Sequence, residues 1–262
     1  MISEIDKRIE VGRKAVLSQV DFLHGQFGKA KSFWKEDETR VTPADLEISQ
    51  NIIALISEGF PEDDVFSEET DSKTGPRDLT KRFTWILDPI DGTNNFALGI
   101  PFVSISLGLL EDGLPVYGFV YDLGRRELFH GGPGKGVWSG DSKIERRKEG
   151  SGGKKKIVVI HTEVDAKTLP LINEIINGST LRNMGSAALH LTYTGLGLID
   201  VCIDFKVRIW DVAAACALCA ETGIEIKFLR EPAFPLKKFD VKASPVEFVA
   251  GDVGFYDAIL QK

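Results

Sequence analysis

The sequence is poor in the residues that several classes of protein need. It has three cysteines and four histidines among 262 residues. Three cysteines in a long chain cannot make the disulfide framework of a small secreted protein, and they favour a reducing compartment. The histidines stand apart from the motifs described below, which argues against histidine-based acid–base catalysis and against a zinc site.

Long apolar runs and an excess of positive charge are also missing. No run approaches the ~18 residues of a membrane span, and the N-terminal MISEIDKRIE is charged where a signal peptide would be apolar. A net charge of -7 argues against a general nucleic-acid surface. The short basic cluster at residues 146–148 and 154–156 is interpreted as a solvated loop. We therefore expect a cytoplasmic protein without nucleic-acid or membrane partners.

Apolar residues make up 43% of the chain, which is enough for a substantial core. Their helical spacing predicts an amphipathic helix over residues 2–23. A second helix is predicted after Thr42, which can cap it, up to Gly59, with Leu46 and Ile52 turned towards the core. The CALC segment around the second and third cysteines is typical of a buried helix, not of a redox motif.

Strand patterns follow the second helix. Residues 83–87 form a short apolar run, and residues 102–122 alternate and turn at Glu-Asp-Gly, which predicts an antiparallel meander. The Gly-, Ser- and Lys-rich residues 131–156 are the expected boundary between two halves. Strands and helices alternate after this segment. The pattern predicts a layered α/β or α+β architecture.

The stretch LDPIDGTNNF, residues 87–96, places Asp88 and Asp91 three residues apart directly after an apolar run. Pro89 removes a ladder donor and Gly92 permits a turn, so the strand is predicted to end here with both carboxylates folded towards one point. Clustered carboxylate oxygens suit hard ions such as Mg²⁺ or Mn²⁺. The alternative is an Asx-type turn with solvated aspartates.

Further acidic positions raise the same choice between function and local structure. Asp45 can act at a site or cap its helix, and Glu68 with Glu69 can bind a metal or form a solvated loop. Asp211, directly after Trp210, can be a ligand or a partner of the helix dipole.

Three motifs together resemble the inositol monophosphatase family of lithium-sensitive, magnesium-dependent phosphomonoesterases. They are Glu68-Glu69, DPIDGT at residues 88–93 and WDVAA at residues 210–214, in this order and spacing. VTPAD at 41–45, GIPFVSISLGL at 99–109 and RNMGSAAL at 182–189 extend the resemblance over nearly the whole chain.

The resemblance implies one domain over residues 1–262 with the fold of fructose-1,6-bisphosphatase and inositol monophosphatase. That fold is a layered α/β sandwich in which helix and sheet layers alternate as αβαβα. The N-terminal half, residues 1–150, would carry the metal-binding motifs. The C-terminal half, residues 151–262, would bind the substrate and supply the last metal ligand. A homodimer is also implied.

The family's metal ligands fall on matching positions. Glu68, Asp88 and the backbone carbonyl of Ile90 are implied for one Mg²⁺, and Asp88, Asp91 and Asp211 for a second. A third, weaker Mg²⁺ would be reached through Glu68 and waters. Metals roughly 3.5–4 Å apart can stabilise the attacking and leaving oxygens of a phosphate ester, so no protein nucleophile is needed.

The resemblance also assigns catalytic and substrate-binding roles. A water of the third Mg²⁺ site, which is reached through Glu68, would be the nucleophile, and Asp45 with Thr93 would orient and deprotonate it. The N–H groups at the start of the helix after the motif can bind the phosphate. Asp204 matches the family's acid that binds substrate hydroxyls, and a carboxylate can accept hydrogen bonds from neighbouring hydroxyls of a polyol. The alternative is that Asp204 is simply an aspartate at the end of a strand. The implied substrate-binding residues are Gly92, Thr93, Gly185, Ser186, Ala187 and Asp204.

Some positions depart from the family pattern. Ser67 replaces the glycine that usually precedes the two glutamates, and Thr222-Gly223-Ile224 replaces paired glycines after the last motif. Neither change removes a ligand. Lys206 and Arg208 are basic where many relatives differ, which could favour a second phosphate on the substrate.

The expected function is Mg²⁺-dependent hydrolysis of a small phosphorylated polyol, with inositol 1-phosphate as the first choice. Fructose 1,6-bisphosphate, histidinol phosphate and 3′-phosphoadenosine 5′-phosphate remain alternatives with the same chemistry. A regulatory scaffold is the alternative from another class, and the intact ligand set argues against it.

Overall fold

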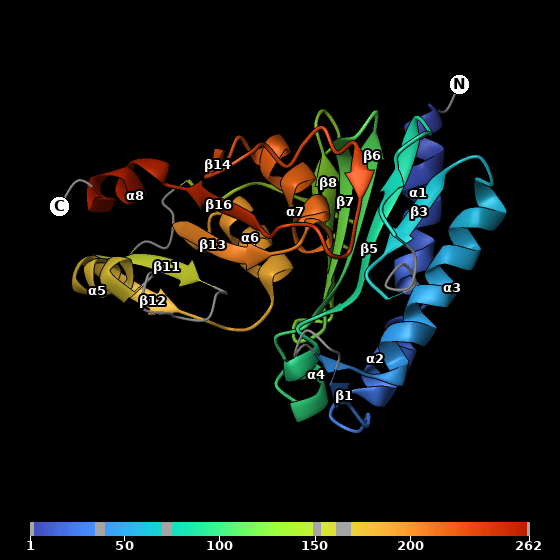
Figure 1. Cartoon of the computed structure of the whole chain (residues 1–262), viewed down its shortest axis with the longest axis horizontal. Helices are drawn as coiled ribbons and strands as arrows, with labels where there is room; N and C mark the ends of the chain where they lie inside the picture. The colour runs from blue at the N-terminus through green and yellow to red at the C-terminus, as the bar shows by residue number, and fades with distance from the viewer. Residues whose placement is uncertain (1–2, 35–39, 70–74, 149–152, 161–168, 261–262) are drawn as a thin grey trace.

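The helices and sheets of the protein stack as five alternating layers (Figure 1). The computed structural model describes residues 3–34, 40–69, 75–148, 153–160 and 169–260. The first layer consists of helices packed on one face of a sheet. Its members are α1 (Glu4–Leu17), α2 (Val20–Gln26) and α3 (Pro43–Gly59).

The first helix is interrupted, in contrast to the single helix predicted over residues 2–23. The Ser18 hydroxyl donates to the carbonyl of Ala15 at 2.8 Å, and α2 starts anew after Gln19. A serine side chain that bonds the backbone in this way competes with helix continuation. The second helix begins and ends as predicted, because Thr42 and Asp45 form a capping box. Leu46, however, is 43% exposed, so its predicted burial is wrong.

The second layer is a seven-stranded sheet in the order β10-β9-β8-β7-β6-β5-β3. The predicted meander is confirmed within it, and among the described strands of this sheet only β3 and β5 pair in parallel. The predicted boundary segment, residues 131–156, contains two strands that extend this sheet. The strands are β3 (Asp64–Ser67), β5 (Phe83–Asp91), β6 (Ser104–Glu111), β7 (Leu114–Asp122), β8 (Glu127–Gly132), β9 (Gly136–Ser139) and β10 (Ser142–Ile144).

The middle layer is α6 (Ala187–Gly195) and α7 (Ile209–Thr222), between the two sheets. Helix α7 lies very close to the first sheet, because a Cβ at Gly118 of β7 would stand 2.0 Å from the carbonyl oxygen of Ala214. Cys216 and Cys219 are buried in this helix, as predicted.

The fourth layer is a five-stranded sheet in the order β12-β11-β13-β16-β14. Its residues alternate between faces, so Val159 packs towards α6 and α7 while Val158 and Ile160 pack towards the outer helices. Those helices, α5 (Leu169–Gly178) and α8 (Val253–Leu260), form the fifth layer. The strands are β11 (Lys156–Ile160), β12 (Ser179–Arg182), β13 (Val201–Val207), β14 (Ile226–Phe228) and β16 (Val246–Gly251).

Two short antiparallel ribbons complete the fold. One pairs β1 (Phe33–Trp34) with β2 (Arg40–Val41), and the other pairs β4 (Arg77–Asp78) with β15 (Lys238–Phe239). A short helix, α4 (Thr93–Leu98), follows β5. Among the described residues, no helix has the length and apolar content needed to cross a bilayer.

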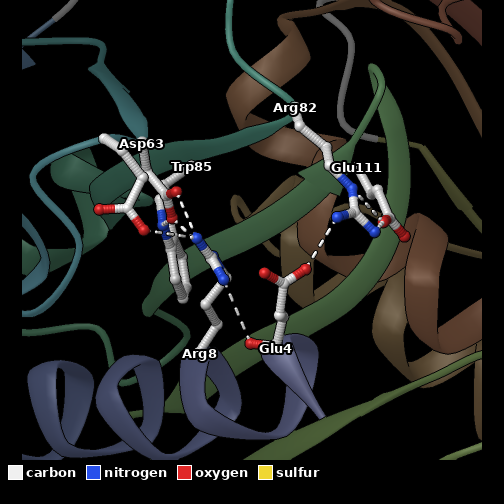
Figure 2. Close-up of polar contacts among 7 residues, drawn as sticks. Glu4, Arg8, Asp63, Arg82, Trp85 and Glu111 are labelled. Carbon is white, nitrogen blue, oxygen red and sulfur yellow. Dashed lines mark hydrogen bonds and ion pairs between the residues drawn. The ribbon is translucent and has the colours of Figure 1, made fainter.

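A buried ion pair fastens α1 to the first sheet (Figure 2). Arg8 is 4% exposed, and its Nε and Nη2 donate to the two carboxylate oxygens of Asp63 at 2.8 and 2.7 Å. The Trp85 indole N–H also donates to Asp63, at 2.9 Å. The guanidinium lies 4.2 Å from the ring centre of Phe60 and 3.8 Å from that of Phe83. The charge is therefore enclosed by partners on α1, β5 and the end of α3.

We expect Arg8→Met to lower the free energy of unfolding by about 3–5 kcal/mol, because it leaves the Asp63 carboxylate buried without its partner. Arg82→Met is the matched control. Arg82 also pairs with carboxylates, those of Glu4 and Glu111, but it is 58% exposed, so its loss should lower the stability far less. Urea unfolding of both variants gives the two values. Equal losses in the free energy of unfolding for the two variants would contradict the conclusion that the buried pair stabilises the fold more than the exposed one.

Candidate functional site

A β-bulge brings the two aspartates of the DPID motif to one side of the first sheet. The predicted strand at residues 83–87 lies within β5, which continues through the motif and ends at Asp91, so the two carboxylates meet within the strand and not in a turn after it. Asp88 pairs with Ser106 and Asp91 with Ser104, so three steps along β5 match two along β6. Side chains three residues apart on a regular strand point to opposite faces, and the extra residue of the bulge puts both carboxylates on the same face.

The start of α7 adds a third carboxylate. Asp211 lies in the first turn of the helix, where one of its oxygens accepts from the Arg208 amide at 2.7 Å. One oxygen each from Asp88, Asp91 and Asp211 lie within 4.8 Å of one another. Asp88 and Asp91 are almost fully buried, at 3% and 4% exposure. We call these three residues the aspartate cluster.

Burial and mutual repulsion make the aspartate cluster electrostatically costly. Burial, and then the charges of Glu68, Asp91 and Asp211, raise the pKa of Asp88 well above its usual range. Burial followed by the charge of Asp91 raises the pKa of Asp211 in the same way. Glu68, at the end of β3, is thus an electrostatic neighbour of the cluster. A divalent cation would remove the repulsion, and an all-oxygen donor set fits a hard ion.

Asp91 also has a structural role at the N-terminus of α6. Its carboxylate accepts from the backbone amides of Ala187 and Ala188 at 3.2 and 2.8 Å, and from the hydroxyls of Ser186 and Ser104. A negative charge is favoured at this end of a helix, where backbone N–H groups are left without partners. Asp91 therefore joins the DPID motif directly to the predicted substrate segment at residues 185–187.

The predicted catalytic pair lies together. The Thr93 hydroxyl is 3.2 Å from Asp45 Oδ1 and 2.9 Å from the carbonyl oxygen of Ile90. A hydroxyl has one proton, so it donates to one of these oxygens at a time. Asp45 is buried, and its Oδ2 accepts from the amide and hydroxyl of Thr42 at 2.8 and 2.6 Å. Asp45 is thus both a member of the capping box of α3, through Oδ2, and the residue predicted to deprotonate the water, through Oδ1.

The glycine of the motif is required by its protein neighbours. Gly92 has a φ of +93° and caps α4. A Cβ there would stand 2.9 Å from the carbonyl oxygen of Gly185 and 3.1 Å from that of Phe102. Packing against Gly185 and Phe102 therefore requires a glycine here, in addition to the turn predicted from the sequence.

The remaining predicted substrate residues are split between two places. Gly185, Ser186 and Ala187 lie beside the DPID motif, at the start of α6. Asp204 is buried on β13 and is outside the described group of clustered carboxylates. One of its oxygens accepts from the Lys206 amide at 3.1 Å, next to an irregularity in the pairing of β13 with β16.

Sequence reasoning missed several polar residues that hold the site. Asn95 donates through Nδ2 to the carbonyls of Phe102 and Met184 at 2.9 and 2.7 Å, which ties α4 to the substrate segment. Ser49 of α3 is hydrogen-bonded to Ser67 at 2.7 Å, so the family departure at Ser67 links the helix of Asp45 to the strand before Glu68. Two fully buried serines on β6, Ser104 and Ser106, contact the motif region. A signal for the last two was present, since polar residues alternate there within an apolar strand.

We expect Asp88→Asn to raise the melting temperature of the metal-free protein by a few degrees at pH 8, because it removes repulsion within the cluster. The sign follows from linkage: an acid whose pKa is higher in the folded state favours folding at low pH, and this stability is lost as the pH rises through that pKa. The gain should therefore shrink as the pH is lowered. Mg²⁺ at about 100 times its Kd should stabilise the wild type by about 2.7 kcal/mol and the variant much less.

Asp122→Asn is the control for both effects in thermal unfolding with and without chelator. Asp122 is a buried aspartate of β7 that accepts from Tyr193 and from the Arg125 amide and is not a member of the cluster. Asp122→Asn should not raise the melting temperature of the metal-free protein, and Mg²⁺ should stabilise it as much as it stabilises the wild type. A metal-free Asp88→Asn less stable than wild type would contradict the repulsion, and an unchanged Mg²⁺ response would contradict a cation site.

Comparisons with known proteins agree on one family. The model of the inositol monophosphatase family matches residues 6–252. The chain is 30% identical to inositol monophosphatase 1 of Bos taurus over 70% of this chain and 69% of that protein. It is 31% identical to the Nus factor SuhB of Pasteurella multocida, over 72% of each. It is 25% identical to the fructose-1,6-bisphosphatase/inositol-1-monophosphatase of Aquifex aeolicus, over 99% and 96%.

Solved structures show the same fold. The Thermotoga maritima IMPase superposes with a TM-score of 0.79 at 25% identity, over 97% of this chain and 95% of that one. An IMPase/NADP phosphatase complexed with Mg²⁺ and phosphate superposes with a TM-score of 0.77 at 22% identity, over 94% and 90%. Because the family model spans most of the sequence and curated relatives match it over more than two thirds, the chain belongs to the inositol monophosphatase family.

Proposed function

We propose that the protein is a Mg²⁺-dependent phosphomonoesterase that hydrolyses a small phosphorylated polyol, with inositol 1-phosphate as the preferred ester. The observation that carries the proposal is the aspartate cluster: three carboxylates, two of them deeply buried, lie within 4.8 Å of one another. Such an arrangement is unfavourable unless cations occupy it. Membership of the family adds the reaction class.

The proposed ligands divide between two ions. Glu68, Asp88 and the carbonyl of Ile90 would hold one Mg²⁺, and Asp88, Asp91 and Asp211 a second, with a third reached through Glu68. When bound, these ions would lower the pKa of water and stabilise the charge that develops on the phosphate oxygens. Asp91 can be a metal ligand and also an acceptor at the start of α6, because the backbone amides and hydroxyls that donate to it leave it negatively charged.

The proton path is proposed to run through Thr93 and Asp45. The Thr93 hydroxyl can donate to Asp45 Oδ1, which leaves its oxygen free to accept from an attacking water. Asp45 Oδ1 then receives the proton while Oδ2 stays bonded to Thr42. The phosphate would bind the amides at Gly92 and Thr93. The segment Gly185 to Ala187, with Asp204, would contact the hydroxyls of the polyol.

The test is phosphate release from inositol 1-phosphate, fructose 1,6-bisphosphate, histidinol phosphate and 3′-phosphoadenosine 5′-phosphate, with and without Mg²⁺. Wild type should require Mg²⁺ and prefer inositol 1-phosphate. Asp45→Asn should lower kcat by about 10²–10⁴-fold, the usual contribution of a general base, while the Mg²⁺ concentration for half-maximal rate changes little. Asp211→Asn should lose activity by weakening Mg²⁺ binding instead.

Glu47→Gln is the matched control for Asp45→Asn. Glu47 is an exposed acid on the same helix, two residues further on, so this change should leave kcat within about two-fold. Absence of turnover on all four esters by folded protein with Mg²⁺ would contradict the enzymatic proposal. A scaffold role, suggested by the name of the relative called a Nus factor, would then be favoured.

A bisphosphate is the second candidate substrate, and an exposed basic residue favours it. Lys206 is exposed on the irregular part of β13, two residues from Asp204. The relative from Aquifex aeolicus is named for fructose 1,6-bisphosphate as well as inositol 1-phosphate. Arg208 is a weaker candidate, because its guanidinium donates to the carbonyl of Ala243.

We expect Lys206→Met to lower kcat/KM for fructose 1,6-bisphosphate about ten-fold, the effect of losing one charged hydrogen bond, with little change for inositol 1-phosphate. Lys227→Met is the control, because Lys227 is a partly exposed lysine on β14 of the same sheet that pairs with Asp257. Equal losses on both esters would exclude recognition of a second phosphate by Lys206. Cytoplasmic location, a homodimer and lithium sensitivity stay predictions.

A further inference from the structure

Four side chains from four separate segments lie in a row of ring contacts that ends at Trp210, the residue before Asp211 of the aspartate cluster. The guanidinium carbon of Arg77 lies 4.4 Å from the ring centre of Phe66. The Phe66 ring is stacked on that of Phe239, with centres 5.0 Å apart and planes 6° from parallel. The Phe239 ring contacts that of Trp210, with centres 5.8 Å apart. We call this set the aromatic column.

The column joins elements that carry different proposed ligands. Phe66 lies on β3, two residues before Glu68, and Trp210 lies on α7 directly before Asp211. Phe239 lies on β15, between them. All three rings are buried, at 2%, 5% and 2% exposure for Phe66, Trp210 and Phe239. A displacement of any ring would therefore be transmitted to a backbone that holds a carboxylate of the site.

The central ring comes from a segment that crosses between the halves of the molecule. The chain between β14 and β16, orange-red in Figure 1, reaches over to the first sheet. There Phe239 pairs with Arg77 across the β4–β15 ribbon. The amide of Leu79 donates to the carbonyl of Lys237 at 2.9 Å, and the amide of Leu236 donates to that of Gly113 at 2.8 Å. These two bonds fix the segment that leads into Phe239 to β4 and to the turn between β6 and β7.

The same end of α7 is held by a further contact. The hydroxyl of Ser106 lies 3.4 Å from the carbonyl oxygen of Trp210, and Ser106 is the cross-strand partner of Asp88. Ser106 of β6 thereby connects the backbone of Asp88, its cross-strand partner, to the residue before Asp211. The strand before Glu68 lies one position further from α7, since it pairs with β5. The aromatic column supplies a packed connection between the Glu68 strand and the Asp211 helix.

We propose that Phe239 is a positioning residue for the metal centre, which fixes the separation between Glu68 and Asp211 through its contacts with Phe66 and Trp210. This inference rests on the proposed function, because it presumes that these carboxylates bind cations. An aromatic ring suits the role, since it is rigid and offers two flat faces. A leucine at position 239 would fill less of the site and could not stack on Phe66 while its other side contacts the tilted Trp210 ring.

The test is Mn²⁺ binding to Phe239→Leu, followed by the electron paramagnetic resonance signal of free Mn²⁺, with Mn²⁺ standing in for Mg²⁺. Groups that orient metal ligands typically change affinity by 10–100-fold when lost, so we expect a Kd roughly ten-fold higher than wild type. Phe119→Leu is the matched control. Phe119 is fully buried on the face of β7 that packs against α1, beside Gly12 and Tyr117, and belongs to a different core cluster.

Both variants should lower the melting temperature of the metal-free protein, and only Phe239→Leu should weaken Mn²⁺ binding. An affinity equal to that of Phe119→Leu would overturn the inference. Failure of wild type to bind Mn²⁺ would instead overturn the proposed function. If Phe239→Leu does not fold, Arg77→Gln decides, because Arg77 is exposed and ends the column. A raised Kd supports the positioning role, and an unchanged Kd overturns it.

Discussion

The carboxylate of Asp91 is the contact on which the centre of the molecule depends. It comes from the last residue of β5 and accepts from two amides at the start of α6 and from two serine hydroxyls. A buried charge of this kind is tolerated because all these donors complement it. The middle layer is thereby fixed to the first sheet at the same point where the aspartate cluster forms. Replacement of Asp91 would disturb the fold and the site together, which is why Asp45 and Asp211 serve better to separate catalysis from metal binding.

The carboxylate cluster lowers the stability of the metal-free protein, and the packing around it offsets that cost. Helix α7, which carries Asp211, can lie close to the sheet because β6 and β7 have glycines where a Cβ would collide with it: 3.0 Å from Ala213 at Gly108, and 2.0 Å from Ala214 at Gly118. On the opposite face the Arg8–Asp63 pair holds α1. The site is thus built where backbone approaches backbone, so that its ligands have little freedom to move apart when their charges repel.

Much of this arrangement could be predicted from sequence, because local patterns determine it. Thr42 and Gly59 mark the ends of α3, and the alternation in residues 102–122 marks the meander. The family motifs identify the acidic residues. What could not be predicted depends on pairing between distant segments. The bulge in β5 is set by its register with β6, and Asp88 and Asp91 were instead expected to meet at a strand end. Likewise, nothing local indicates that Phe239 reaches Phe66, because 173 residues separate them in the sequence.

The layers also suggest how one metal centre can serve different esters. Two members of the cluster lie on β5 of the first sheet, and the third lies at the start of a helix packed closely on it. The proposed contacts to the sugar or inositol ring come from residues 185–187 and from Asp204, which belong to the second half. Residues 184–188 are joined to the motif region by the bonds of Asp91 and by the one from Asn95 to Met184, whereas Lys206 lies on a different element, β13. On the proposed function, changes in β13, such as a lysine at position 206, could therefore alter substrate choice while the ligands of the cluster stay in place. The relatives named inositol monophosphatase and fructose-1,6-bisphosphatase/inositol-1-monophosphatase fit this division.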